Sequence, residues 1–229
     1  MCNSSHPLLS SEDAVLCESS TKRAVTSVGY NLSFTALSLR PELARIVGEI
    51  YQAEGDWDAA KRRILATNAL QTRSSASSVR LERELRQRLA LLTADQLAIL
   101  VDAPAGERGA IAWLAAMKHS EFVFDFAAEL LRDKLELQDP VLRASEYERF
   151  VEAKSLVHPE LTRLKPSSAA KIRRVLLHML VEAGLLVPGA ALGTIHRPVL
   201  SPALRRSITD DDPRWLAGFL VPQAEIAGS

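Results

Sequence analysis

Four leucines follow the spacing of an α-helix: Leu81, Leu85, Leu89 and Leu92. At about 100° per residue these side chains share one face of a helix. The segment therefore predicts an amphipathic helix with a buried leucine face. The preceding residues, 73–78, are small and polar and predict a loop. Similar helical spacings recur along the chain, so the sequence predicts an all-α protein.

The opposite side of this predicted helix is basic and faces solvent or a partner. Arg80 and Arg83 lie there, and Arg73 lies in the loop before it. Ser74 and Ser77 add hydroxyl groups nearby. Arginine and hydroxyl side chains are common phosphate ligands, so this stretch is a candidate phosphate-binding surface. A solvated helix face is the alternative interpretation.

Part of this positive charge is expected to be paired within the helix. Glu84 lies four residues from both Arg80 and Arg88, and Glu82 lies four residues from Arg86. Residues at this spacing are neighbours on a helix surface and form ion pairs. Arg73 and Arg83 have no acidic residue at helical spacing and are expected to stay unpaired.

The charge of the whole chain is balanced, but its distribution is not. Lys plus Arg and Asp plus Glu each number 28, which argues against a wholly basic nucleic-acid-binding protein. Residues 61–90 nevertheless hold eight basic against two acidic residues, and residues 160–180 hold five against one. Any binding of a polyanion is therefore expected at these two places.

Residues 1–28 form a serine-rich leader that we expect to lack structure. Cys2 and Cys17 both lie in it and cannot cross-link a core, which indicates a reducing compartment. No run approaches the ~18 to 20 apolar residues of a membrane span. The leader also lacks the pattern of a secretory signal. The sequence predicts a cytoplasmic protein that does not contact a membrane.

Residues 29–138 are predicted to form an N-terminal helical domain. Pro41 suits a first helical position, and Asp56 suits a helix N-cap. Thr93 and Gln96 have the spacing of a capping box. The segment 122–137 is apolar almost all round and is expected in the middle of a helical bundle.

Residues 139–208 are predicted to form a second small domain. Asp139 and Pro140 are expected to open a helix, and Ser167 or Ser168 to cap a longer one that stops at Gly184. Residues 185–200 resemble a short β-hairpin. Three helices followed by a hairpin is the order of a winged helix-turn-helix. Residues 209–229, with the acidic run 210–212, are expected to form a solvated tail.

The long helix of this second domain has a basic outward face, which a winged helix places in the major groove of DNA. The residues that we expect to contact DNA are Arg62, Arg63, Arg73, Ser74, Ser77, Arg80 and Arg83 on the first surface and Ser167, Lys171, Arg173, Arg174, His178 and Arg197 on the second. Winged helices also dock proteins, so the fold alone does not decide the ligand.

The sequence lacks the patterns of common catalytic and metal sites. The five histidines lie on separate predicted elements and form no HExxH motif. No glycine-rich phosphate loop is present. The carboxylates on predicted helices mostly have basic neighbours, as surface ion pairs do. We therefore expect no enzyme, no metal or other cofactor and no small-molecule substrate.

Several stretches together resemble the BrxA family of the BREX bacteriophage-exclusion systems. They are the segments 30–35, 41–42, 56–57, 68–70, 73–80 with Glu84 and 88–89, and 182–186. The resemblance covers about residues 30 to 205 and rests on the order and spacing of these stretches. It implies a small all-helical protein, with a fold likened to the antitermination protein NusB, that binds double-stranded DNA through positive surfaces.

The resemblance further implies a non-catalytic accessory component of a phage-defence complex that contains methyltransferase, ATPase and phosphatase-like subunits. Two alternatives remain open. The same surfaces are also suited to docking other subunits of the complex without touching DNA. The NusB-like fold suggests RNA binding as a further possibility. Whether the two basic surfaces form one groove does not follow from the sequence.

Overall fold

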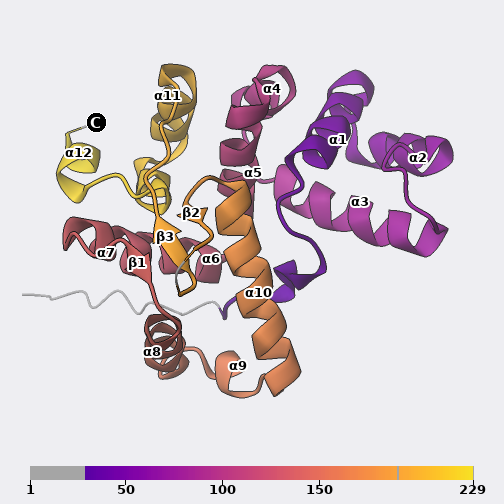
Figure 1. The fold of residues 1–229 in the computed structure, drawn as a ribbon. Helices are drawn as coiled ribbons and strands as arrows, with labels where there is room; N and C mark the ends of the chain where they lie inside the picture. Colours follow the sequence, from indigo (N-terminus) through magenta and orange to yellow (C-terminus); the bar gives the residue numbers. More distant parts are fainter. Residues whose placement is uncertain (1–28, 190, 229) are drawn as a thin grey trace, which may run out of the picture.

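The structure is a computed structural model that describes residues 29–189 and 191–228. Most of the described chain is helical, which confirms the predicted all-α class (Figure 1). The leader 1–28, with Cys2 and Cys17, lies outside the described residues.

The N-terminal helices and helical turns are η1 (Ser33–Ala36), α1 (Pro41–Glu54), α2 (Trp57–Thr67), α3 (Ser75–Leu89), α4 (Ala94–Asp102), α5 (Ala105–His119), α6 (Glu121–Asp125), η2 (Phe126–Leu131) and α7 (Arg132–Glu136). They are followed by α8 (Ala144–Ser155), α9 (Pro159–Thr162), α10 (Pro166–Glu182), α11 (Pro202–Asp211), η3 (Pro213–Phe219) and α12 (Gln223–Ala227). Three short strands, β1 (Val141–Leu142), β2 (Leu186–Val187) and β3 (Gly193–Ile195), form an antiparallel sheet in the order β1-β3-β2.

Several helix ends lie where local sequence chemistry places them. Asp56 caps α2 by accepting a hydrogen bond of 2.8 Å from the backbone N–H of Ala59. Thr93 and Gln96 form the predicted capping box at the start of α4. Gly184 follows α10 with φ at 73°, in the left-handed region that glycine adopts at little cost. These predictions are confirmed.

Two other predicted helix starts are wrong. Pro140 does not open a helix, because Val141 and Leu142 form β1 and pair with β3, and α8 begins at Ala144. The partner strand lies far along the chain, so no local signal reports this pairing. Neither Ser167 nor Ser168 caps α10, because that helix already begins at Pro166, whose fixed φ suits a first helical position.

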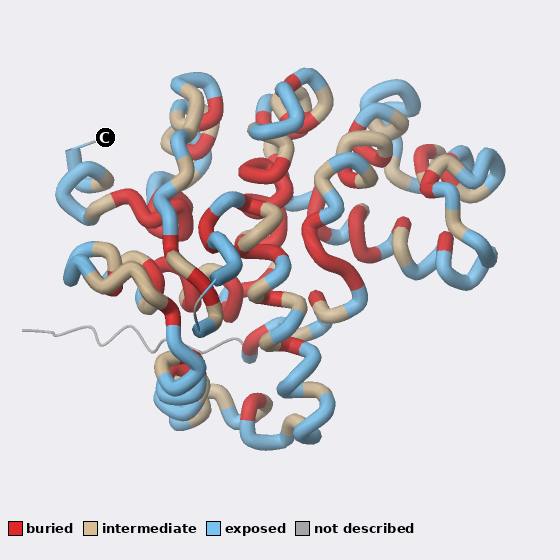
Figure 2. The backbone as a smooth tube through the Cα atoms, in the orientation of Figure 1, coloured by how far each residue is buried: buried red, intermediate tan, exposed pale blue. Residues whose placement is uncertain are grey.

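The buried core runs through both predicted domains. Residues 109–117 of α5 are all buried, and Trp113 at its centre donates a hydrogen bond of 3.0 Å from Nε1 to the carbonyl of Gly218. Phe122 and Phe126 are fully buried, as predicted, although their helix is interrupted by the π-helical turn η2. Figure 2 shows these buried stretches at the centre of the molecule. The division into domains 29–138 and 139–208 stays a prediction.

The C-terminal residues add to this core. Trp215, Leu216 and Phe219 of η3 are buried, within the segment that the sequence analysis treats as a tail. The acidic run before η3 also forms an ion pair, in which Asp211 Oδ2 lies 2.6 Å from the Nζ of Lys118. Apolar residues of 213–221 therefore contribute to the interior. No described helix is both long enough and apolar enough to cross a bilayer.

An ion-pair network joins α7 to the start of α8. The buried Nζ of Lys134 lies 2.7 Å from Asp139 and 2.6 Å from Glu146, and Arg143 also contacts both carboxylates. Hydrogen bonds from Lys134 and Arg143 hold the pKa of Asp139 at about 2. Burial raises the pKa of Glu146, but hydrogen bonds from Lys134 and from the Arg143 backbone outweigh it, so that this pKa is also lowered.

We expect the free energy of unfolding to decrease as the pH falls from about 4 toward 2. Both carboxyl groups bind protons more weakly in the folded chain, so the unfolded chain takes up more protons in this range. The stability is therefore fully present above the unfolded pKa and is lost as the pH falls through the folded pKa. Thermal melting across this range measures the effect. The double variant Asp139→Asn with Glu146→Gln should show a flatter pH profile, and an equally steep one would contradict the assignment.

Candidate nucleic-acid interface

Residues Phe34–Leu39, here called the bridging segment, lie between α3 and α10 (Figure 1). Arg88, near the end of α3, donates hydrogen bonds to this segment. Its Nη1 donates to the carbonyl of Ser38 at 2.8 Å, and its Nη2 donates to those of Leu37 at 2.8 Å and Phe34 at 3.2 Å. Burial lowers the pKa of Arg88 to about 10, so the group stays charged at neutral pH. A buried cation thus satisfies three carbonyls of a non-repetitive stretch.

The other side of the bridging segment is held by Glu182, at the end of α10. Its carboxylate accepts hydrogen bonds from the Ser38 hydroxyl at 3.1 Å and from the Leu39 N–H at 2.7 Å. His178 Nδ1 lies 3.9 Å from the same carboxylate. Both helices are therefore fastened to one short segment, and the side chains beside it on α3 and α10 belong to one region of the molecule.

On the first predicted surface, three arginines keep an unpaired charge. Arg62 on α2, Arg73 in the loop before α3, and Arg80 on α3 are exposed, and none forms an ion pair within the described chain. Arg63 differs, since its Nη1 lies 2.7 Å from Glu54. We infer that Arg62, Arg73 and Arg80 carry most of the free positive charge predicted here.

The internal pairing of α3 is only partly as predicted. Arg86 pairs with Glu82 at 2.7 Å, as expected. Glu84 pairs with neither Arg80 nor Arg88, and its Oε1 instead lies 3.9 Å from Arg83 Nη2. The prediction for Arg88 is wrong because the carbonyls of the bridging segment take its hydrogen bonds. Arg88 and Arg86 therefore add little to the surface charge.

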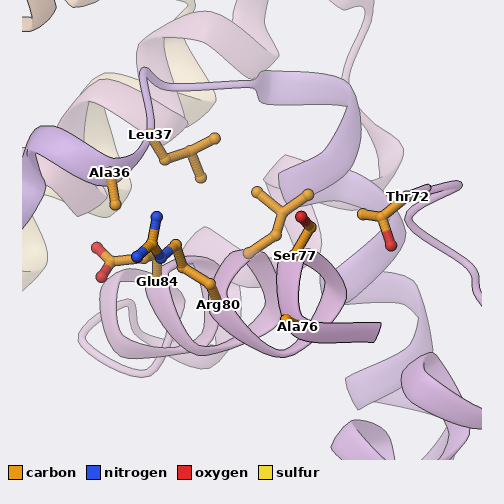
Figure 3. Close-up of a pocket in the computed structure, with 8 residues that line it drawn as sticks. Ala36, Leu37, Thr72, Ala76, Ser77, Arg80 and Glu84 are labelled. Carbon is orange, nitrogen blue, oxygen red and sulfur yellow. The ribbon is translucent and has the colours of Figure 1, made fainter. Parts of the chain in front are cut away.

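The two predicted serines lie at the start of α3. The Ser74 hydroxyl caps the helix by accepting from the Ser77 N–H at 3.2 Å, and it also donates to the Ser77 hydroxyl at 2.9 Å. Ser77 lines a cavity of about 470 Å³ between α3 and the bridging segment, together with Arg80 and Glu84 (Figure 3). Ser74 is thus used in capping, and Ser77 faces a pocket.

On the second predicted surface, Ser167, Lys171, Arg174 and His178 are exposed along α10. Neither Lys171 nor Arg174 has an ion-pair partner among the described residues. Arg173 lies on the flank, 3.8 Å from Glu148 and 5.9 Å from the ring centroid of Tyr147. Lys171 and Arg174 are therefore the cations of this helix that remain available.

Arg197 forms a hydrogen bond away from α10. Its Nε donates to the carbonyl of Leu220 at 2.7 Å, which ties the chain after β3 to the end of η3. This contact gives Arg197 a structural role beside the predicted contact with DNA.

A further cation, Arg40, was missed by the sequence analysis. It is exposed, has φ at 48° and precedes α1. It lines a cavity of about 530 Å³ together with Arg174 and His178 of α10. Nothing in the sequence spacing connects Arg40 with α10, because the bridging segment brings them together. The one local feature that could have drawn attention to Arg40 is its position as a basic residue directly before Pro41, which opens a helix.

The two cavities adjoin across the bridging segment, since Ala36 and Leu37 line both. Arg80 lies on the α3 side, and Arg40 and Arg174 lie on the α10 side. The structure therefore places cations of both predicted surfaces around one segment. No group of three or more His, Cys, Asp or Glu in the described part of the chain has the geometry of a metal site.

The fold and this basic region define a small all-α protein with a known structural relative. A crystal structure of an uncharacterized protein from Magnetospirillum magneticum aligns with a TM-score of 0.72 and 21% sequence identity, covering 83% of this chain and 97% of that one. This similarity establishes the fold alone.

The chain belongs to the BrxA family, whose sequence profile matches residues 29–212. A relative, BREX protein BrxA from Escherichia coli O9:H4 (strain HS), is 28% identical over 141 residues. That alignment covers 62% of this chain and 66% of the relative, slightly under two thirds of its length. The resemblance stated from the sequence is thereby confirmed at the level of the family.

We expect Arg88→Met to lower the free energy of unfolding by about 3 kcal/mol. The substitution keeps an apolar stem but leaves three carbonyls of the bridging segment without their donor. Urea denaturation measures the change. Arg83→Met is the matched control, because that side chain is 55% exposed and its ion pair is long, and it should change stability by less than about 0.5 kcal/mol. Equal effects of the two variants would contradict the role given to Arg88.

Proposed function

We propose that this protein is a non-catalytic, DNA-binding component of a BREX phage-defence system. Membership of the BrxA family supports a role in a BREX system, and the name of the E. coli relative agrees with this role. DNA binding is supported by the placement of three arginines that have no carboxylate partner in residues 29–189 and 191–228. Arg80 lies on one side of the bridging segment, and Arg40 and Arg174 lie on the other.

In this proposal the DNA backbone lies along the region between α3 and α10. Arg62, Arg73 and Arg80 contact phosphates on one side, and Lys171 and Arg174 contact them on the other. Such contacts give affinity with little sequence preference. The order β1, α8, α9, α10, β2, β3, with β1 joining the hairpin, supports the winged-helix interpretation of residues 139–208. On that interpretation α10 enters the major groove.

We expect duplex DNA to bind with a steep dependence on salt. Between about 50 and about 200 mM salt, several phosphate contacts should reduce affinity by tens- to thousands-fold. The double variants Arg73→Glu with Arg80→Glu, and Lys171→Glu with Arg174→Glu, should each weaken binding and lower the salt slope by about 2. Fluorescence anisotropy with a labelled duplex measures both quantities.

The matched control is Arg149→Glu with Arg206→Glu, which makes the same change of charge at exposed positions on α8 and α11. Thermal melting of all variants checks that they fold. An absence of binding at low salt, or equal losses in the control and in the two test variants, would reject the proposal. Stronger competition by structured RNA than by duplex DNA would favour the NusB-like RNA-binding alternative.

A specific observation favours a second candidate function, docking of another BREX subunit. Leu156 and Val157, at the end of α8, are 85% and 60% exposed. A cavity of about 450 Å³ between α8, α9 and α10 is lined in part by Val151 and Leu161. Exposed apolar side chains beside an apolar cavity are typical of a protein-binding surface.

If this surface binds a subunit, Leu156→Asp should abolish co-purification with the other BREX proteins, even after nuclease treatment. The introduced charge would have to be desolvated against the partner. Leu137→Asp, at a position 79% exposed after α7, is the matched control and should leave co-purification unchanged. Retention of the partner by Leu156→Asp would exclude this surface.

A further inference from the structure

The cavity between α3 and the bridging segment has the size and lining of a small-ligand pocket. Its volume of about 470 Å³ lies within the range of ligand-binding pockets. Ala36 and Leu37 form one side, while Arg80, Leu81 and Glu84 project from α3 on the other. Apolar walls with a few charged groups favour a flat ligand that carries polar substituents.

Glu84 in this pocket is a buried carboxylate without a hydrogen-bond donor. The residue is 5% exposed, and its Oε2 has no hydrogen-bond partner among the described residues. Within the part of the chain that the structure describes, its ion pair is the long contact of 3.9 Å between Oε1 and Arg83 Nη2. Buried polar atoms are nearly always hydrogen-bonded, because leaving one unpaired is costly. Because Glu84 lines the cavity, a ligand there that donates an N–H or O–H to its carboxylate would offset part of this cost.

The charges around Glu84 restrict what that donor is. Arg80 extends from α3 on the same side of the pocket as Glu84 (Figure 3) and makes no ion pair within the described chain. Arg83 lies close to the carboxylate, and the buried Arg88 interacts electrostatically with it. Three arginines oppose the entry of a lysine or arginine side chain. A neutral donor joined to an anionic group satisfies Glu84 and Arg80 together.

We propose that this pocket binds a mononucleotide. The N–H groups of the base donate to Glu84, and the phosphate accepts from Arg80. Leu37 and Leu81 contact the faces of the ring. Glu84 and Arg80 are one helical turn apart, about 6 Å between Cβ atoms, and the long, exposed Arg80 side chain is able to extend further, so the two groups suit a ligand with a base at one end and a phosphate at the other. Guanine is favoured because its ring N–H and amino group are adjacent donors.

The proposal shares Arg80 with the proposed duplex surface but is tested without DNA, and it adds a small ligand where the sequence predicts none. Isothermal titration calorimetry of the full chain with GMP, in the absence of DNA, tests it. GMP should bind saturably. Guanosine, inorganic phosphate and AMP each lose part of the contacts and should bind at least about tenfold more weakly. Failure of GMP to bind at millimolar concentration would overturn the proposal whatever the result with duplex DNA.

Two variants assign the binding to this pocket. Glu84→Gln replaces one acceptor by a donor and should weaken GMP binding at least about tenfold. Glu82→Gln alters a neighbouring buried carboxylate that does not line the cavity and should leave it unchanged. Arg80→Met lies at an exposed position that does not endanger folding, and it should also weaken GMP binding at least about tenfold, while guanosine binding stays the same. GMP affinity that is unchanged in both Glu84→Gln and Arg80→Met would refute the assignment.

Competition between GMP and an oligonucleotide distinguishes a free nucleotide from a nucleotide at the end of a strand. A short single-stranded oligonucleotide ending in dG offers the same base and phosphate as GMP. If GMP binds more tightly, the ligand is a free nucleotide. If the oligonucleotide binds more tightly and Glu84→Gln removes this preference, the pocket takes a nucleotide at a strand end. An oligonucleotide that binds equally well to Glu84→Gln attaches elsewhere, and this result would overturn the assignment of a strand end to the pocket.

Discussion

The arrangement of this protein depends on two opposite charges that hold one short stretch of chain. Arg88 from α3 binds three carbonyls of the bridging segment, and Glu182 from α10 accepts from a hydroxyl and a backbone N–H of the same segment. Apart from the turn η1, this stretch makes no regular secondary structure, so its polar groups need partners from elsewhere. Because the two partners sit on different helices, satisfying the segment also fixes α3 beside α10.

This constraint explains how a chain with no net charge exposes a basic region. Many carboxylates are used in structural pairs, as Glu82 with Arg86 and Glu146 with Lys134 are. Arg88 is buried, and its charge serves the fold. The cations that remain unpaired on α3 and α10, joined by Arg40, then lie on either side of the bridging segment. A surface suited to a polyanion thus arises from position and not from composition.

The same constraint creates the pocket beneath the basic region. Arg88 binds the carbonyls of Phe34 and Leu37, which flank Ala36, and so holds this stretch against α3. Glu84 is buried and lines the cavity between the two. A buried carboxylate oxygen without a hydrogen-bond donor, as Glu84 Oε2 is among the described residues, is unfavourable, and a ligand that donates to this carboxylate would offset the cost. The fold and the pocket therefore have a common origin in the same pair of helices.

The sequence by itself determined the family, the helical class and many helix ends. Leu85 and Leu89 are buried as their spacing predicts, and Asp56, Thr93 with Gln96, and Gly184 act where local chemistry places them. These features depend on neighbours a few residues away. The tertiary structure alone decided the strand at Val141, the burial of η3, the use of Arg88 and the position of Arg40 beside Arg174. Each of these features depends on groups that are distant in the chain and that compete for the same carbonyls, carboxylates or apolar surface. Spacing along the sequence does not indicate which of these groups forms the contact.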